Sequence, residues 1–206
     1  MRLCLVRHGE TAWNREHRMQ GWTDIPLNAE GRLQAQAVAR ELSGVRFDGI
    51  FSSPLLRALQ TAQAVAAGRP IDLEPRLRER HHGRLQGLTR QEMAQQHPEL
   101  AAALNQRQTG YQPPGGESIE TFAERVHAAL ADLLAQHAEK TLLVVAHGGV
   151  LDIALRLASG QDLYSPRRHA LPNAALNWLL AGPEGWQVQA LGITHHLERT
   201  AQDDTG

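Results

Sequence analysis

The segment Leu3-Cys4-Leu5-Val6-Arg7-His8-Gly9-Glu10-Thr11 carries the strongest structural signal in this chain of 206 residues. Its first four residues are apolar, and the run ends abruptly in Arg7 and His8. A short, continuous apolar run is typical of a strand that is buried on both faces of a parallel sheet. The sequence therefore predicts a buried strand over 3–6 whose last residue meets a charged site.

Further along the chain, apolar runs of the same kind alternate with helical patterns. One run begins at Gly49-Ile50-Phe51, and another covers 142–146 before His147. Apolar residues at helical spacing predict helices over 29–42, 54–67 and 118–136. The first of these helices is expected to have Asn28 as its N-cap, and the second is expected to have Ser53 as its N-cap and Pro54 as its first residue. The alternation predicts an α/β fold, a three-layer α/β/α sandwich with a mainly parallel central sheet.

The remaining segments complete a single expected domain over 1–206. Strand patterns at 174–180 and 187–193 flank Gly182-Pro183-Glu184-Gly185, which predicts a late antiparallel hairpin. Residues 83–118, called here the cap segment, are rich in turn residues and are expected to form two short helices over the sheet. The polar end from Arg199 to Gly206 is expected to fray.

Composition excludes several classes of protein. The net charge is −1, which offers no general attraction for nucleic acid or anionic membranes, and no apolar segment reaches the roughly 18 residues of a membrane span. Cys4 is the single cysteine, so a cytoplasmic location is expected. Twenty of the 21 basic residues are arginine, and 11 histidines accompany them. Both residue types suit an anion site, although codon usage explains such a bias equally well.

Charged groups follow three of the predicted strands. They are Arg7 and His8 after the first, Arg57 shortly after the second, and His147 after the third. The carboxyl ends of parallel strands meet at one edge of a sheet, and helix amino termini there add free N–H groups. Two arginines and two histidines at one edge would repel one another without a bound anion. The sequence therefore predicts an anion-binding pocket.

Four motifs in this order resemble the histidine phosphatase superfamily, in the branch that includes cofactor-dependent phosphoglycerate mutases. The first is Leu5-Val6-Arg7-His8-Gly9-Glu10-Thr11, followed by Trp13-Asn14. The others are Ser52-Ser53-Pro54-Leu55-Leu56-Arg57-Ala58-Leu59-Gln60-Thr61-Ala62, then Leu77-Arg78-Glu79 with Gly83 and Gly87, and finally Val145-Ala146-His147-Gly148-Gly149. The resemblance covers roughly residues 2–180.

The resemblance implies a phosphohistidine mechanism with His8 as the nucleophile and Glu79 as the general acid and base. It also implies a phosphate clamp made by Arg7, Arg57 and His147, with the backbone N–H of Gly148 and the side chain of Asn14 as further contacts. An imidazole attacks phosphorus only when it is unprotonated, and neighbouring arginines favour that form.

No metal or other cofactor is expected. Two arginines balance the charge of a phosphate dianion, and His147 adds a further donor. A zinc site is the alternative for a histidine-rich chain, but the adjacent His81 and His82 would point apart on a strand.

The segment 79–88 is close to the version found in the mutases, which have a tyrosine where His82 stands. The stretch before the last motif is shorter than in mutases, however, and contains Arg107 without an adjacent arginine. We therefore expect a phosphomonoesterase acting on a small phosphorylated metabolite. A mutase-type phosphotransferase and a non-catalytic phosphometabolite-binding module remain alternatives, as do monomer and homodimer. Possible contacts to the rest of the substrate are Gln20, Gly21, Arg80 and His82, with Arg84, Arg167, Arg168 and His169 as further candidates.

Overall fold

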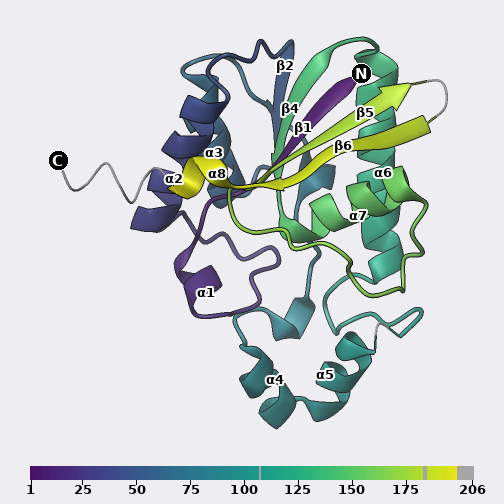
Figure 1. The fold of residues 1–206 in the computed structure, drawn as a ribbon. Coiled ribbons are helices and arrows are strands. Elements are labelled where there is room, and N and C mark those ends of the chain that lie inside the picture. Colours follow the sequence, from purple (N-terminus) through teal and green to yellow (C-terminus); the bar gives the residue numbers. More distant parts are fainter. Residues whose placement is uncertain (107, 183–184, 199–206) are drawn as a thin grey trace.

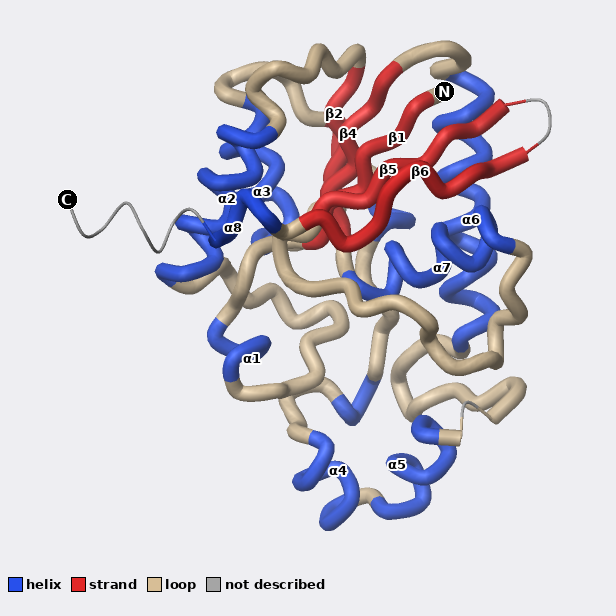
Figure 2. Tube along the Cα trace, viewed as in Figure 1, coloured by secondary structure: helices blue, strands red, loops and turns tan. Residues whose placement is uncertain are grey.

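The centre of the molecule is a six-stranded sheet with the strand order β3-β2-β4-β1-β5-β6 (Figure 2). The computed structural model describes residues 1–106, 108–182 and 185–198. Neighbouring strands from β3 to β1 are parallel, whereas β5 is antiparallel to β1 and β6 is antiparallel to β5. The strands are β1 (Arg2–Arg7), β2 (Gly49–Ser52), β3 (Asp72–Leu73), β4 (Thr141–Ala146), β5 (Leu176–Gly182) and β6 (Gly185–Ile193).

Strand β1 lies between β4 and β5 and is buried on both faces, as its continuous apolar run predicts. Leu5 is opposite Val144 of β4 and Asn177 of β5. Leu3 and Leu5 belong to one hydrophobic cluster, and Cys4 and Val6 belong to another on the opposite face. Burial raises the pKa of the Cys4 thiol, so it stays protonated.

Helices cover both faces of the sheet, which confirms the three-layer sandwich (Figure 1). One face packs against α6 (Ile119–Gln136) and α7 (Gly148–Ser159), and the other packs against α2 (Ala29–Glu41) and α3 (Leu56–Ala66). The short α8 (His195–Glu198) contacts α2. Among the described residues, no helix combines the length and the apolar character needed to span a membrane.

One predicted helix start is wrong. Helix α3 begins at Leu56 after Leu55 as N-cap, so Pro54 is outside the helix and Ser53 does not cap it. The Ser53 hydroxyl instead hydrogen-bonds the imidazole of His147 at 2.8 Å. The same Oγ accepts a hydrogen bond from the N–H of Leu55 at 3.4 Å, ahead of the first residue of the helix. The predicted cap of α2 is confirmed, because the Asn28 side chain accepts a hydrogen bond from the N–H of Gly31 at 2.8 Å.

Strands β5 and β6 form the late hairpin that the sequence predicts. Its two turn residues Pro183 and Glu184 lie outside the described residues, as do Arg107 and the ending over 199–206.

The helices of the cap segment lie beyond the carboxyl ends of the parallel strands, at the bottom of the view in Figure 1. The segment contains η2 (Gly83–Leu85), α4 (Arg90–Gln96) and α5 (Pro98–Asn105), and a short turn, η1 (Pro75–Leu77), leads into it. A small hydrophobic cluster of Leu85, Met93 and Ala101 packs inside the cap segment, separate from the two clusters against the sheet. The short helix α1 (Ala12–Arg15) lies in the loop after β1.

Candidate active site

The ends of β1, β2 and β4 bring the predicted histidines together. The backbone N–H of His8 donates to the carbonyl of Ala146 at 3.0 Å, and that of Ser53 donates to the carbonyl of Val145 at 3.0 Å. The rings of His8 and His147 consequently lie with their centroids 5.2 Å apart.

The tautomer of His8 is fixed by its own neighbour. Its Nδ1 lies 2.7 Å from the carbonyl oxygen of Gly9, which can only accept, so Nδ1 carries the proton. Nε2 of the neutral ring then keeps its lone pair. Burial, followed by the charges of Arg57 and Arg7, holds the pKa of His8 well below its usual value. The ring is therefore neutral at physiological pH and chemically suited to attack an electrophile.

Arg57 is held by backbone carbonyls at the base of the site. Its Nη1 donates to the carbonyl of Thr23 at 3.0 Å and its Nη2 donates to that of Gly21 at 2.8 Å. Gly21 has a φ of +53°, and a Cβ there would lie 2.1 Å from Oε1 of Gln86. Gly21 thus supports the guanidinium through its backbone. Burial lowers the pKa of Arg57 to about 10, and it remains charged at neutral pH.

Arg7 and His147 complete the group around His8. Nη1 of Arg7 donates to the carbonyl of Leu171 at 2.5 Å. Nε2 of His147 is bound to Ser53 Oγ, which accepts from the N–H of Leu55 at 3.4 Å and can donate its own proton to the ring. When Ser53 donates this proton, the neutral His147 ring carries its own proton on Nδ1. Burial is the main cause that lowers the pKa of His147, so the ring is neutral.

Three buried nitrogens of this group have no hydrogen-bond partner within the described ranges: Arg7 Nε, Arg57 Nε and His147 Nδ1. An unpaired buried donor costs about 1–3 kcal/mol, so three around one histidine mark a place for an acceptor. Two arginines make that acceptor an anion, as the sequence predicts. Phosphate oxygens suit such donors.

Hydrogen bonds hold both the carboxylate and the backbone carbonyl of Glu79. Its carboxylate accepts from the N–H of Gly149 at 3.0 Å and from that of Arg80 at 2.8 Å. Its backbone carbonyl accepts from Nε1 of Trp22 at 2.7 Å and from Nη2 of Arg125 at 2.9 Å. The roles of Trp22 and Arg125 are not predictable from the sequence, because neither residue lies in a pattern that reports a contact over such separations.

Asn14 and Gln20 lie on the segment after β1. Asn14 is part of a capping box in α1: its Oδ1 accepts from the N–H of Thr11 at 3.1 Å, and Nδ2 of Asn173 lies 3.3 Å away. Its own Nδ2 takes no part in these bonds. Gln20 is buried, and its Oε1 has no partner in the described part of the chain.

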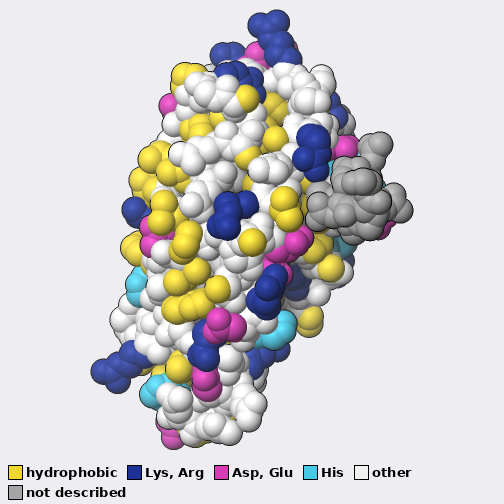
Figure 3. Space-filling model, turned by 90° about the vertical axis from the view of Figure 1, so that its left-hand side faces the viewer, with side chains coloured by type: hydrophobic (Ala, Val, Ile, Leu, Met, Phe, Trp, Pro, Cys, Tyr) yellow, Lys and Arg dark blue, Asp and Glu magenta, His cyan; other side chains and the backbone are white. Residues whose placement is uncertain are grey.

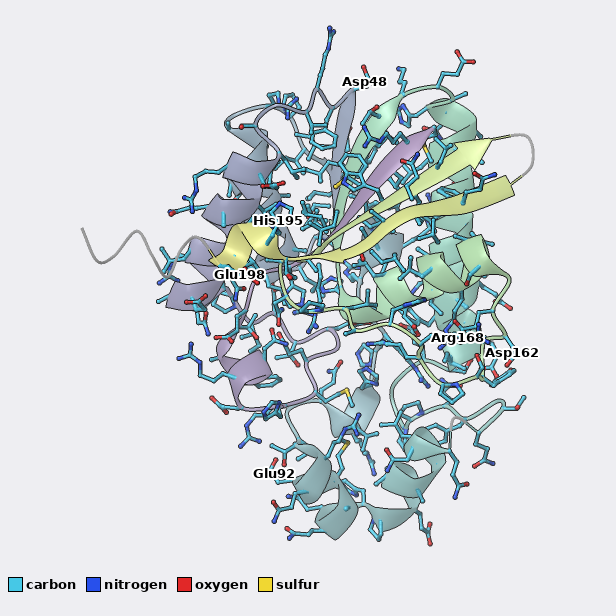
Figure 4. All side chains as sticks on the ribbon, viewed as in Figure 1. Asp48, Glu92, Asp162, Arg168, His195 and Glu198 are labelled. Carbon is cyan, nitrogen blue, oxygen red and sulfur yellow. The ribbon has the colours of Figure 1, made fainter. Side chains whose placement is uncertain are left out.

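A pocket of about 560 Å³ opens beside the candidate active site, between α7 and the cap segment. Of the predicted substrate-side residues, Arg80, His82 and Arg167 line it together with Arg7, Glu79 and Gly148. Gln20 and Gly21 do not line this pocket. Neither do Arg84, Arg168 and His169, which are exposed. Figure 4 shows Arg168 in the loop between α7 and β5.

On the face in Figure 3, arginine and lysine side chains are scattered among acidic and hydrophobic ones. No cluster of three or more histidine, cysteine or acidic side chains suited to a metal ion occurs among the described residues.

Comparisons with known proteins agree with the motifs and the fold. The family model of the histidine phosphatase superfamily (branch 1) matches residues 3–194. Phosphoglycerate mutase-like protein 4 of Arabidopsis thaliana is 38% identical over 210 residues, which cover 96% of this chain and 87% of that protein. The structure of Bacillus stearothermophilus YhfR has a TM-score of 0.89 and 33% identity, covering 95% of this chain and 98% of that one. Phosphoserine phosphatase of Entamoeba histolytica, solved with 3-phosphoglyceric acid, has a TM-score of 0.86 and 29% identity, with coverage of 95% and 98%. This chain belongs to branch 1 of the histidine phosphatase superfamily.

Proposed function

We propose that the protein is a phosphomonoesterase that hydrolyses a small phosphorylated metabolite through a phosphohistidine intermediate on His8. The observation that carries this proposal is the neutral His8 ring, with its proton fixed on Nδ1, beside three buried nitrogens that need an acceptor. A phosphoryl group meets both conditions, because its phosphorus is the electrophile and its oxygens are the acceptors.

In the first step, Nε2 of His8 attacks phosphorus and the bond to the ester oxygen breaks. Arg7, Arg57 and His147 hold the phosphoryl oxygens, with the N–H of Gly148 and the amide of Asn14 as further donors. Glu79 gives a proton to the departing alcohol. Glu79 regains this proton from water in the second step, which balances the cycle.

In the second step, water attacks the phosphorus of phosphohistidine. Glu79, now a carboxylate, takes the proton of that water, the P–N bond breaks, and inorganic phosphate leaves. The electron pair of the broken bond returns to Nε2, which restores the neutral ring. Fixed contacts to both carboxylate oxygens keep Glu79 in place for its two roles.

The experiment that tests this proposal traps the intermediate. The wild type is mixed with a phosphate-labelled aryl phosphate, quenched in alkali and assayed for acid-labile label on His8, while release of phosphate is followed in parallel. We expect label and turnover in the wild type and neither in His8→Ala. Binding of phosphoesters without label or turnover in the wild type would support a non-catalytic module instead.

A mutase-type phosphotransferase is the second candidate, favoured by the segment 79–88 and by the similarity to the Arabidopsis protein. The two functions differ in where the phosphoryl group goes. Incubation with 3-phosphoglycerate and 2,3-bisphosphoglycerate gives 2-phosphoglycerate in the mutase case. The proposed phosphomonoesterase gives inorganic phosphate.

A further inference from the structure

The pocket beside His8 carries more positive than negative side chains. Among the described residues, its charged lining consists of four arginines and two acidic residues: Arg7, Arg80, Arg90 and Arg167, with Glu79 and Asp152. In the proposed reaction the phosphoryl dianion balances the charges of Arg7 and Arg57. Positive charge therefore remains along the part of the pocket that receives the alcohol part of the substrate.

Arg167 is held by a carboxylate that it shares with another arginine. Its Nε lies 3.2 Å from Oδ1 of Asp152 on α7. Oδ2 of that carboxylate lies 3.1 Å from Nε of Arg156, which is buried and also binds the backbone carbonyls of Asp162 and Ser165. One negative charge thus faces two positive charges, so this group of side chains keeps a net positive charge.

The guanidinium of Arg167 lies close to the phosphate-binding end of the pocket. Its Nη2 is 3.5 Å from the carbonyl oxygen of Gly148. Burial lowers the pKa of Arg7, and the positive charge of Arg167 acts in the same direction, because the two guanidinium groups repel each other. The side chain of Arg167 is 42% exposed, so Nη1 can bind a ligand while Nε stays paired with Asp152.

Arg80 presents a second guanidinium to the same pocket. Its Nε and Nη2 donate to the backbone carbonyls of Glu117 at 3.0 Å and Tyr111 at 3.3 Å, which carry no net charge. The carboxylate of Glu117 is paired with Arg125 instead. Within the described part of the chain, Arg80 is therefore anchored by carbonyls without an ion pair.

Two neutral groups of the pocket lining also need hydrogen-bond partners. Nδ1 of His82 and the hydroxyl of Tyr111 are buried, and neither has a partner within the described ranges. Burial lowers the pKa of His82 to about 4, so its ring is neutral at physiological pH. A ligand that brings further oxygen atoms into the pocket would remove the cost of these unpaired groups.

We propose that Arg167 is a specificity-determining residue that binds, together with Arg80, a second anionic group on the alcohol part of the substrate. This inference rests on the proposed phosphomonoesterase function, which places the first phosphoryl group at Arg7. The second group is a carboxylate or a phosphate, since guanidinium groups bind the oxygens of both with charge-assisted hydrogen bonds. A substrate without it leaves these cations without a counter-charge.

The test compares phosphate monoesters that have nearly the same shape and differ by one charge. The carboxylate pair consists of the esters of 3-hydroxypropanoate and 3-hydroxypropanamide. The phosphate pair consists of the bisphosphate and the monophosphate of propane-1,3-diol. We expect kcat/KM for at least one anionic ester to exceed that of its neutral counterpart by about tenfold or more, and the preferred pair identifies the second group. No preference in either pair would overturn the inference.

Variants of one exposed loop test the cause of the preference. Arg167→Gln should lower the ratio of kcat/KM about tenfold by slowing the anionic ester, while Arg167→Lys should keep part of the preference. Arg168→Gln is the matched control, because Arg168 is exposed, does not line the pocket and changes the net charge equally. A ratio that stays unchanged in Arg167→Gln, or that falls equally in Arg168→Gln, would contradict a contact with Arg167.

Binding measurements separate this inference from the proposed function. His8→Ala cannot form phosphohistidine, so calorimetry on this variant reports the affinity for each ester without turnover. Tighter binding of the anionic ester, lost when Arg167→Gln is added, supports the inference even if the wild type hydrolyses neither ester. Equal affinities together with equal rates of phosphohistidine formation leave the proposed function intact and remove the inference.

Discussion

His8 obtains its reactive tautomer from the carbonyl of the next residue, at 2.7 Å. A tandem of histidine and glycine can therefore set the proton position without a distant partner. His147 differs, because Ser53 from another strand orients its ring. The His8 ring is oriented by its neighbour in the sequence, whereas the His147 ring is oriented only when β2 and β4 are paired in the sheet.

Gly149 is a position where the addition of a single methyl group should lower kcat. A Cβ at this position would lie 2.1 Å from Oε1 of Glu79. We expect Gly149→Ala to displace the carboxylate and to lower kcat for an alkyl phosphate by about 10- to 100-fold. An aryl phosphate, whose alcohol leaves without a proton, should lose much less.

Stability separates this effect from misfolding. A Cβ at Gly149 would also lie 3.1 Å from the buried Phe122 ring, so Gly149→Ala should lower the free energy of unfolding by about 1–3 kcal/mol and leave the protein folded. Gly44→Ala is the control, because a Cβ at Gly44 would meet no atom within 4 Å. Equal losses on alkyl and aryl esters would show that Gly149 does not act through Glu79.

The charges of the site also predict its response to chelators. Arg7 and Arg57 supply two positive charges against a phosphate dianion, so activity should be unchanged after dialysis against EDTA. Phosphate release from an aryl ester measures this directly. Loss of activity that a divalent cation restores would assign charge neutralisation to a metal.

Among the elements, helix α6 holds the loop that carries Glu79, the proposed general acid. Arg125 donates to the backbone carbonyls of Arg76, Arg78 and Glu79 at 2.6, 2.7 and 2.9 Å, and it is paired with Glu117 at 2.5 Å. One side chain therefore fixes the path of the backbone into Glu79. It acts as a positioning residue.

Arg125→Lys should weaken this hold because an ammonium group cannot make the same divergent set of bonds. We expect kcat for an alkyl phosphate to fall about tenfold, with a smaller change in KM and a smaller loss for an aryl phosphate. Steady-state kinetics on both esters give this comparison. Glu124→Gln, an exposed neighbour on α6, is the control. If Arg125→Lys changed KM alone, a role in positioning Glu79 would be untenable.

The elements differ in how well the sequence predicts them. Strands β1 and β4 are evident from their apolar runs, and α2 from its Asn28 cap. Strand β3 has two residues and α1 has four, too few for a periodic pattern. The predicted start of α3 is two residues too early, because Leu55 has an extended backbone conformation that the Ser53-Pro54 pattern does not reveal. The motifs place His8, Glu79 and His147, but the pocket wall depends on the packing of α7 against the cap segment.

For the whole molecule, buried neutral histidines link stability to pH. The pKa values of His8 and His147 are lowered in the folded protein, chiefly by burial, and His82 shifts in the same direction. Below pH 6.5 the histidines of the unfolded chain bind protons, whereas these rings stay unprotonated in the folded protein. The free energy of unfolding therefore falls as the pH falls. Above pH 6.5 the contribution is fully present.

We therefore expect the free energy of unfolding to decrease from pH 6.5 to pH 5, by up to about 1.4 kcal/mol per pH unit for each such histidine. Urea unfolding across this range gives the slope. His8→Gln should reduce this slope by the contribution of one histidine. A stability that rises toward pH 5 would contradict the burial of neutral rings.

The separate hydrophobic cluster of the cap segment has a consequence for how this protein can diverge. Leu85, Met93 and Ala101 pack with one another and not within the clusters that stabilise the sheet. Substitutions in the cap segment can therefore change the pocket wall that this segment forms, at little cost to the stability of the sheet and its helices. A chimaera that carries the cap segment of a relative should acquire that relative's substrate selectivity, while the proposed reaction at His8 stays the same.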